Sequence, residues 1–304
     1  MRQLVAPYVG SALCFDHGHG RLGVRAYAEA QTKLERKVLM EKEKKNKILF
    51  RLCLGGGAVF VAILVVIGFL YWQGDATYNE AADLVNAPPA VIADVRSSSS
   101  SSLSEEKEAP APEQVAEALS TVSLDSLEEE SKDVRYWIYV PDTKINYPVM
   151  QGNDNTFYLH HDYKGDYLFA GSIFMDYENH YDFSDFNTIL YGHHMNNGSM
   201  FAGLINYMNT SFAKSHPYIY LTRDGLTSVF QVFSTQQVGA TSYVYRANFA
   251  SDEEKQKYID ACLADSVINT GIVPKTNDHL LTLSTCTNRS GKQRWVVHAV
   301  MVSV

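Results

Sequence analysis

The most apolar stretch of the chain is one uninterrupted run near its N-terminus. Leu52 to Trp72 contains no charged side chain. A helix of about 20 apolar residues, rising ~1.5 Å per residue, spans the hydrocarbon core of a bilayer. The run closes with Tyr71 and Trp72, whose amphipathic rings favour the boundary between lipid and water. The pattern predicts one transmembrane helix over residues 52–72.

Charge differs on the two sides of this run. Residues 1–51 carry 11 Lys/Arg against 5 Asp/Glu, whereas the first charges after the run are acidic. The positive-inside rule then predicts a cytoplasmic N-terminus and an extracellular remainder. A cleaved signal peptide and a buried core helix are the alternatives, but the run is long for the first and lacks the polar face of the second. We also hypothesise that translation can begin at Met40, which opens a basic stretch.

Residues 73–132 form an acidic, Ser/Pro-rich segment that includes the serine run Ser97–Ser102. Such a composition buries too little apolar surface to offset chain entropy, so we expect most of the segment to be disordered. Gln114–Leu127 is an exception, because its apolar residues recur at helical spacing. We interpret the segment as a spacer that holds a folded domain away from the membrane.

From about Asp133 the pattern changes to short runs rich in Tyr, Ile, Val, Phe and Thr. Turn-forming residues separate these runs, which is typical of strands. Two helices are also predicted, over Ser199–Phe212 and over Ser251–Ser266, and the second opens with the capping-box pair Ser251 and Glu254. The domain over residues 133–304 is therefore predicted to be mainly β, either a closed barrel or a sandwich. The predicted strands are Tyr136–Val140, Ile145–Met150, Ser172–Asp176, Asn187–Tyr191, Pro217–Leu221, Thr227–Gln237, His279–Thr285 and Arg294–Val302.

Three polar side chains stand at the ends of predicted strands, where a sheet can hold them rigidly. His193 follows Gly192 after one strand, Cys286 ends another, and Arg294 opens the last. A thiolate attacks an amide if a neighbouring cation stabilises it, a histidine can exchange protons with the amine, and a fixed Arg can stabilise the oxyanion. Spacing alone leaves other interpretations open, since a lone Cys is commonly a small buried residue and His or Arg a surface residue.

The chain lacks the patterns that are typical of metal and nucleic-acid sites. Its four cysteines have no CxxC spacing, and Cys262 recurs with apolar neighbours at helical spacing, which predicts a core position. His160 and His161 are adjacent, and adjacent strand residues point to opposite faces, so we expect no metal there. Outside the N-terminal segment no basic stripe with interleaved aromatic residues occurs, so nucleic acid is not an expected partner. No cofactor is predicted.

The motifs that carry this chemistry resemble those of the sortases. They are Thr282-Leu-Ser-Thr-Cys286, Tyr191-Gly-His193 and Arg294 at the start of the last strand. The pattern Leu190-Tyr-Gly-His-His-Met195, and a helix between the sixth and seventh strands, are similar to class B. The resemblance covers about residues 130–304 and implies an eight-stranded β-barrel with a Cys–His–Arg active site.

The resemblance also implies an activity and roles for individual residues. Cys286 would be the nucleophile, His193 the acid and base, with His194 a non-catalytic neighbour, and Arg294 would bind the substrate carbonyl and oxyanion. The enzyme would cleave a C-terminal sorting signal of secreted proteins through a thioacyl intermediate, which an amine of a peptidoglycan precursor or of a pilin would resolve. The residues that would line the signal-binding groove are Asn155, Leu159, Tyr191 and Ser284. Thr287 departs from the acidic residue of some class B members.

Two alternatives remain at this point. A hydrolytic cysteine peptidase would use the same thiol but let water resolve the intermediate. A non-catalytic wall-binding module on a stalk would need neither the thiol nor the histidine. The favoured interpretation is a cysteine transpeptidase of the cell membrane with a cytoplasmic segment (1–51), an anchor (52–72), a spacer (73–132) and an extracellular catalytic domain (133–304).

Overall fold

The computed structural model describes residues 20–86, 111–286 and 292–302, and for residues 20–28 only the backbone. It divides the chain into two compact units, residues 1–67 and 68–304. Each is described separately below.

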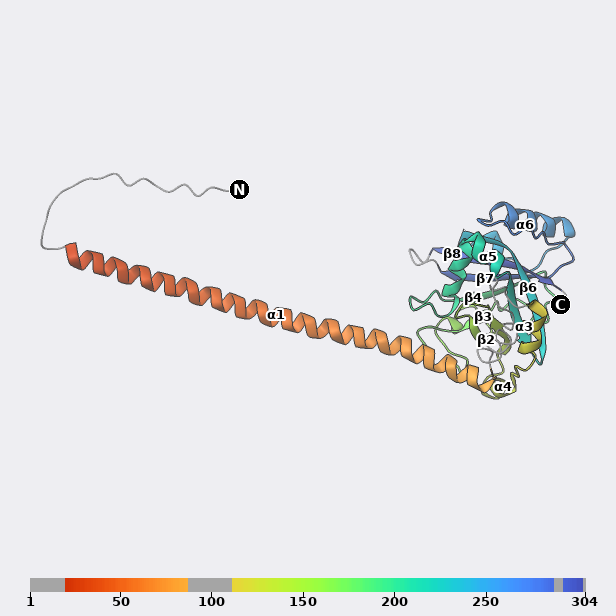
Figure 1. Cartoon of the computed structure of the whole chain (residues 1–304), viewed down its shortest axis with the longest axis horizontal. Coiled ribbons are helices and arrows are strands. Elements are labelled where there is room, and N and C mark those ends of the chain that lie inside the picture. The colour runs from red at the N-terminus through yellow and green to blue at the C-terminus, as the bar shows by residue number, and fades with distance from the viewer. Residues whose placement is uncertain (1–19, 87–110, 287–291, 303–304) are drawn as a thin grey trace, which may run out of the picture. The chain divides into compact units, whose positions relative to one another are not determined.

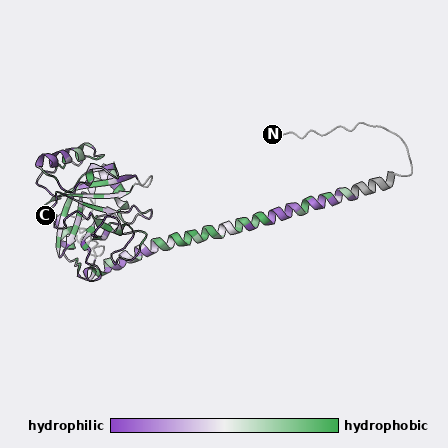
Figure 2. Ribbon diagram, turned by 180° about the vertical axis from the view of Figure 1, so that it is seen from behind, coloured by the Kyte–Doolittle hydropathy of each residue, from purple (hydrophilic) through white to green (hydrophobic). Residues whose placement is uncertain are grey.

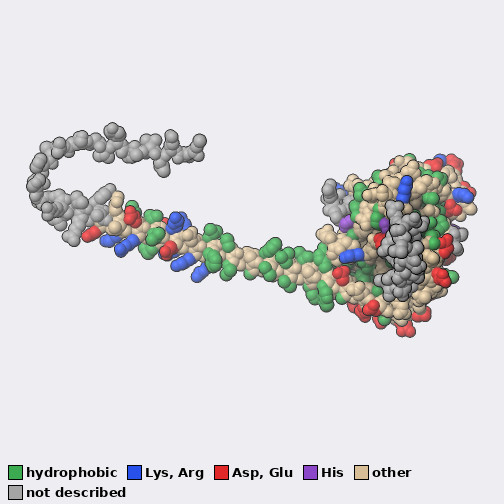
Figure 3. All heavy atoms as spheres, viewed as in Figure 1, with side chains coloured by type: hydrophobic (Ala, Val, Ile, Leu, Met, Phe, Trp, Pro, Cys, Tyr) green, Lys and Arg blue, Asp and Glu red, His purple; other side chains and the backbone are tan. Residues whose placement is uncertain are grey.

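The first unit consists mainly of helix α1 (Gly20–Leu84), which continues into the second unit. Within the described residues α1 is the helix that is long and apolar enough to cross a membrane. Its apolar side chains over residues 52–66 are exposed to the surroundings rather than packed. Basic side chains, with a few acidic ones, gather on the part of α1 that precedes this apolar stretch (Figure 3), where the ribbon is largely hydrophilic (Figure 2). The structure therefore presents the predicted span as an unpacked apolar helix with a basic flank.

The second unit is built on a closed eight-stranded barrel with the strand order β1-β2-β3-β4-β7-β8-β6-β5 (Figure 1). The β2–β3 and β4–β7 pairs are parallel, and the remaining pairs are antiparallel. Each predicted strand has a counterpart, and the choice between sandwich and barrel is resolved in favour of the barrel. The strands are β1 (Val134–Tyr139), β2 (Asn146–Met150), β3 (Ile173–Met175), β4 (Asn187–Gly192), β5 (Tyr218–Arg223), β6 (Leu226–Gly239), β7 (Leu280–Cys286) and β8 (Gln293–Val302).

The β5–β6 hairpin shows how local sequence sets the register. Asp224 and Gly225 form its two-residue turn, and both have positive φ (51° and 75°). This conformation matches the twist of an antiparallel hairpin and favours Asp-Gly. β6 then extends far enough to pair with β8 from Val229 to Gly239, across a bulge between Val232 and Ser234. The pairing with β8 closes the barrel.

Helices cover the barrel and fill the connections between its strands. α6 (Asp252–Ala264) lies between β6 and β7, as predicted, and the Ser251 side chain accepts a hydrogen bond from Glu254 N. The predicted helix 199–212 is instead two elements, the 3-10 helix η2 (Phe201–Met208) and α5 (Thr210–Ser215). They separate at Asn209, whose side chain accepts a hydrogen bond from Ser211 N and so starts a new helix. Two further short 3-10 helices are η1 (Phe157–Leu159) and η3 (Tyr243–Tyr245).

The described parts of the spacer, residues 73–86 and 111–132, are its two ends, and both contain helix. α1 continues to Leu84, and α3 (Pro112–Leu119) and α4 (Asp125–Glu130) pack on the barrel. The helical periodicity noted over 114–127 is confirmed in α3. Residues 87–110, which include the serine run, lie outside the described residues. The order of these parts has a physical reason: apolar residues in and next to these helices are buried in the main core, which offsets the cost of ordering the chain. They are Tyr78, Ala81, Val85, Val115, Leu119, Val122, Leu124 and Leu127.

Candidate active site

The barrel register brings the three predicted catalytic residues to one end of three neighbouring strands. Cys286 of β7 pairs directly with Arg294 of β8, so the two side chains share one face of the sheet. On its other side β7 runs parallel to β4, with Thr285 opposite Gly192. His193 follows Gly192 at the end of β4, and Cys286 follows Thr285 on β7. The three residues therefore lie at the same end of neighbouring strands, although up to 101 positions separate them in sequence.

Gly192 allows the strand that precedes His193 to lie tightly against its neighbours. A Cβ atom at this position would stand 2.4 Å from Ile173 Cδ1 and 2.8 Å from ring atoms of Phe201. Such distances are far below van der Waals contact. The glycine of the Tyr-Gly-His motif is thus needed for packing at the end of β4, directly beside the histidine.

The imidazole of His193 is oriented by the backbone of η1. Its Nε2 atom lies 2.8 Å from the carbonyl oxygen of Leu159. A carbonyl oxygen only accepts hydrogen bonds, so the proton is on Nε2 and Nδ1 is the basic nitrogen of the neutral ring. Burial lowers the pKa of His193 below its usual value, and the nearby His160 and Arg294 lower it further, against the opposing effect of the Leu159 carbonyl. The ring is therefore neutral at neutral pH.

The two cysteines of the barrel unit have opposite environments. Cys286 is partly exposed at the end of β7. Cys262 of α6 is fully buried, as the sequence predicts, and burial raises the pKa of its thiol to about 12. Its Sγ atom lies 3.9 Å from Nε2 of His298, whose pKa burial lowers to about 3. This second Cys–His pair is neutral and closed to solvent, which leaves Cys286 as the accessible thiol of the barrel unit.

Arg294 is half-buried at the start of β8, where its Nη1 donates to the Gln293 carbonyl at 3.2 Å. Its positive charge is close enough to affect both His193 and Tyr245. Thr287, which follows the candidate nucleophile, lies outside the described residues.

Two predicted groove residues share one carboxylate. Asn155 Nδ2 donates to Asp176 Oδ2 at 2.9 Å, and the Tyr191 hydroxyl donates to the same oxygen at 2.8 Å. The side-chain oxygen Oδ1 of Asn155 accepts a hydrogen bond from Tyr177 N at 3.1 Å, which fixes the orientation of the side-chain amide. Asp176 directly follows β3 and is buried. It fixes both side chains in one orientation, and sequence reasoning placed it only as the last residue of a strand.

The other two predicted groove residues also reach the site. Leu159 contributes its carbonyl to His193, and Ser284 Oγ lies 2.9 Å from the Tyr245 hydroxyl. Tyr245, in η3, packs against Tyr191 with ring centroids 6.0 Å apart. Burial raises the pKa of its phenol, and the nearby Cys286 acts in the same direction. Sequence reasoning missed Tyr245, because among 19 tyrosines nothing local distinguishes it.

The remaining histidines near the site have other roles. The backbone of His194 pairs with that of Met200. His160 and His161 follow η1 and diverge: the His160 ring stacks on His193 with centroids 5.7 Å apart, whereas His161 Nδ1 lies 2.7 Å from the Phe157 carbonyl. The described residues include no cluster of three His, Cys, Asp or Glu that could hold a metal ion.

Comparison with known proteins gives a consistent result. The family model described as the sortase domain matches residues 138–302. The sortase B of Listeria monocytogenes is 36% identical over 183 residues, which cover 59% of this chain and 74% of that protein. The crystal structure of Clostridium perfringens sortase B is 37% identical and superposes with a TM-score of 0.57, covering 60% of this chain and all of that one. A Staphylococcus aureus sortase B–substrate complex is 30% identical with a TM-score of 0.60, covering 76% and 98%.

Proposed function

Because this chain belongs to the sortase family, we propose that it is a membrane-anchored cysteine transpeptidase that attaches secreted proteins to the cell wall or to a pilin. The observation that supports the proposal is the register of β4, β7 and β8, in which Cys286 pairs with Arg294 and β4, which His193 follows, runs parallel to β7. Its substrates would be secreted proteins with a C-terminal sorting signal. A peptidoglycan precursor or a pilin would supply the acceptor amine.

In the first half-reaction Cys286 attacks the scissile carbonyl carbon of the signal. The Cys286 thiol proton passes to Nδ1 of His193, and the sulfur forms a bond to the carbonyl carbon. Arg294 donates hydrogen bonds to the oxygen on which negative charge develops. The C–N bond then breaks, the leaving amine takes the proton from His193, and a thioester remains on Cys286.

In the second half-reaction an amine replaces the leaving group. His193 removes a proton from the incoming amine, the amine nitrogen attacks the thioester, and a new amide forms as the Cys286 sulfur leaves and recovers a proton. Water would give hydrolysis by the same path. The neutral state of His193 suits this step, because a neutral imidazole accepts the proton of the amine.

The groove beside the thiol would hold the signal in an extended conformation. Asn155 and Tyr191 are oriented by Asp176, and Tyr245 lies against Tyr191 and Ser284. These groups offer aromatic surface together with amide and hydroxyl groups, which suits the backbone and polar side chains of a peptide. The apolar run of α1 would anchor the enzyme, and the basic residues before it favour a cytoplasmic N-terminus.

The test uses the full-length chain in detergent or in nanodiscs with a sorting-signal peptide and an amine. Mass spectrometry should detect the amide product in excess over the hydrolysed peptide, and a trapped thioester on Cys286. The variant Cys286→Ala should lose at least ~10³-fold in rate, whereas Cys262→Ala, which removes a buried thiol, should stay active. Hydrolysed product alone in the presence of excess amine would identify a peptidase instead. Full activity of Cys286→Ala would reject thiol catalysis.

A further inference from the structure

The membrane-proximal end of α1 contacts the barrel through one buried tyrosine. Tyr78 is 5% exposed, and its ring packs edge-on against Tyr147 with centroids 5.1 Å apart. Its hydroxyl donates to the Gly171 carbonyl at 2.5 Å and lies 3.0 Å from Ser172 Oγ. A hydroxyl that is buried with two partners fixes the position of the backbone that it meets.

The first path from Tyr78 leads to the carbonyl that holds His193. Ser172 N donates to the Tyr158 carbonyl at 2.9 Å, and Ser172 Oγ donates to the His161 carbonyl at 2.8 Å. Ser172 is therefore hydrogen-bonded to both ends of the segment 158–161. Gly171 lies so close to this segment that a Cβ on it would stand 2.4 Å from Leu159 O. Leu159 O is the acceptor of the His193 Nε2 proton, and the same segment carries His160, whose ring stacks on His193.

A second path reaches His193 from the opposite side. The hydroxyl of Tyr147, whose ring contacts that of Tyr78, accepts a hydrogen bond from Met200 N at 3.1 Å. Met200 pairs with His194, and Phe201 N donates to the His193 carbonyl at 2.9 Å. Tyr78 thus supports both the acceptor of the imidazole and the loop that carries it.

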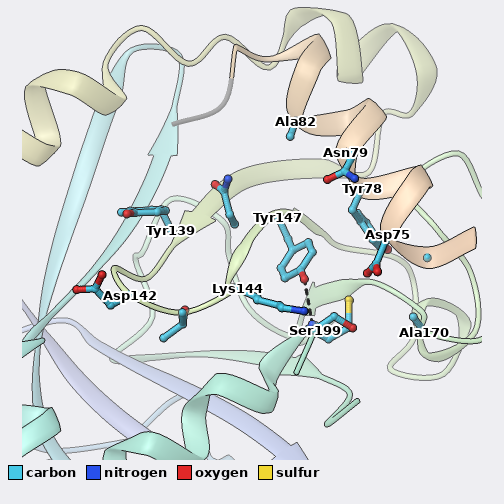
Figure 4. A pocket seen from close by; sticks show the side chains of 14 residues that line it. Asp75, Tyr78, Asn79, Ala82, Tyr139, Asp142, Lys144, Tyr147, Ala170 and Ser199 are labelled. Carbon is cyan, nitrogen blue, oxygen red and sulfur yellow. Dashed lines mark hydrogen bonds between the residues drawn. The ribbon is translucent and has the colours of Figure 1, made fainter. Parts of the chain in front are cut away.

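One part of the contact between α1 and the barrel contains a cavity. A cavity of 630 Å³ lies between the two, with Asp75, Asn79 and Tyr78 on the helix side and Tyr147, Lys144 and Ser199 on the barrel side (Figure 4). Around the cavity Ala81 and Val85 are buried in the core, and Glu80 pairs with Lys164 at 2.7 Å. Among these attachments the hydroxyl of Tyr78 binds the backbone of Gly171, which lies against the segment 158–161.

We propose that Tyr78 is a positioning residue for His193, through which the membrane-proximal end of α1 holds the imidazole in its productive orientation. The inference rests on the proposed function and extends it, because it makes residues 73–86 part of the catalytic unit rather than of the spacer. Misplacing a catalytic group by about 1 Å costs up to ~10²-fold in rate. Loss of one support should cost less.

The test compares two matched variants in the full-length chain. Tyr78→Phe keeps the ring and removes only the hydroxyl. Tyr207→Phe is the control, because it deletes an equally buried hydroxyl whose hydrogen bond goes to the His216 carbonyl at 2.9 Å. We expect kcat for the sorting-signal peptide to fall roughly tenfold further in Tyr78→Phe than in the control. Ser172→Ala removes the contact with Tyr78 from the barrel side together with the hydrogen bond to the His161 carbonyl, so it should lower kcat at least as much and serves if Tyr78→Phe does not fold.

A second readout does not depend on turnover. The His193 imidazole is titrated by NMR in the full-length chain, with its resonance assigned from His193→Gln. The hydrogen bond to Leu159 O raises the pKa of His193, and the charged groups facing the ring are His160 and Arg294. A weaker bond to Leu159 should therefore lower that pKa in Tyr78→Phe and leave it unchanged in Tyr207→Phe. Equal kcat values in the two variants, together with an unchanged His193 titration, would overturn the inference. A wild-type chain that cleaves no signal peptide would reject the proposed function alone, since the titration still tests the link.

Discussion

Removing the side chain of Asn187 should weaken both the fold and the groove. Asn187 is fully buried at the start of β4. Its amide nitrogen lies 3.2 Å from the Val244 carbonyl, 3.0 Å from the Arg246 carbonyl and 3.1 Å from the Tyr258 hydroxyl. Its carbonyl oxygen accepts from Thr282 Oγ1 at 2.7 Å. These contacts hold both sides of Tyr245, whose hydroxyl lies 2.9 Å from Ser284 Oγ on the strand that ends at Cys286.

The expected loss in the free energy of unfolding depends on which partners of Asn187 keep another hydrogen bond after Asn187→Ala. Thr282 Oγ1 still lies 3.0 Å from His298 Nδ1, and the Tyr258 hydroxyl still donates to the Val244 carbonyl. The Arg246 carbonyl loses its bond to Asn187. One buried group deprived of its partner costs about 1–3 kcal/mol and each further bond about 1 kcal/mol, so we expect a loss of about 3 kcal/mol in the free energy of unfolding. Loosening Tyr245 should raise KM for the signal peptide between about threefold and about tenfold.

The assay pairs denaturant unfolding with steady-state kinetics measured well below the unfolding temperature. Asn146→Ala is the control, because it deprives the buried Trp137 Nε1 of its acceptor at 2.7 Å without touching Tyr245. It should destabilise the protein and leave KM near the wild-type value. If the two variants change KM equally, Asn187 does not position Tyr245. If Asn187→Ala costs less than about 1 kcal/mol, the hydrogen-bond reasoning is wrong.

Three further predictions concern pH and packing. The low-pH limb of kcat/KM should have its midpoint below the ordinary histidine pKa, because burial lowers the pKa of His193; a midpoint above about 6.5 would contradict this. Stability should fall as pH drops from about 6.5 toward the pKa of about 3 of His298, because the unfolded chain then binds a proton that the folded chain excludes; His298→Gln should show a flatter stability profile in the same acid-unfolding series. Gly192→Ala should destabilise the protein by roughly 2 kcal/mol and lower kcat more than tenfold, because its Cβ would displace two packed side chains beside the histidine; thermal unfolding and peptide cleavage measure both, and wild-type values would refute the packing argument.

Local sequence determined the secondary structure of the barrel. Alternating β-branched and aromatic residues identified each strand, the Asp224-Gly225 turn fixed one hairpin, and the Ser251 cap started α6, since these signals depend on residues a few positions apart. The apolar run also identified its helix by length and composition alone. The motifs around Cys286, His193 and Arg294 indicated the chemistry. They are three separate segments, and their sequences do not show how they come together.

The tertiary structure decided which residues these segments contact. Only the parallel pairing of β4 with β7 sets His193 beside Cys286, and only a fold that brings η1 back to β4 turns a leucine carbonyl into the acceptor for the imidazole. Tyr245 and Tyr78 escaped sequence reasoning because their roles rest on contacts with residues distant in the chain. The helices of the assumed spacer became ordered for the same reason: their apolar side chains are too few to form a core alone, but the barrel supplies the surface that buries them.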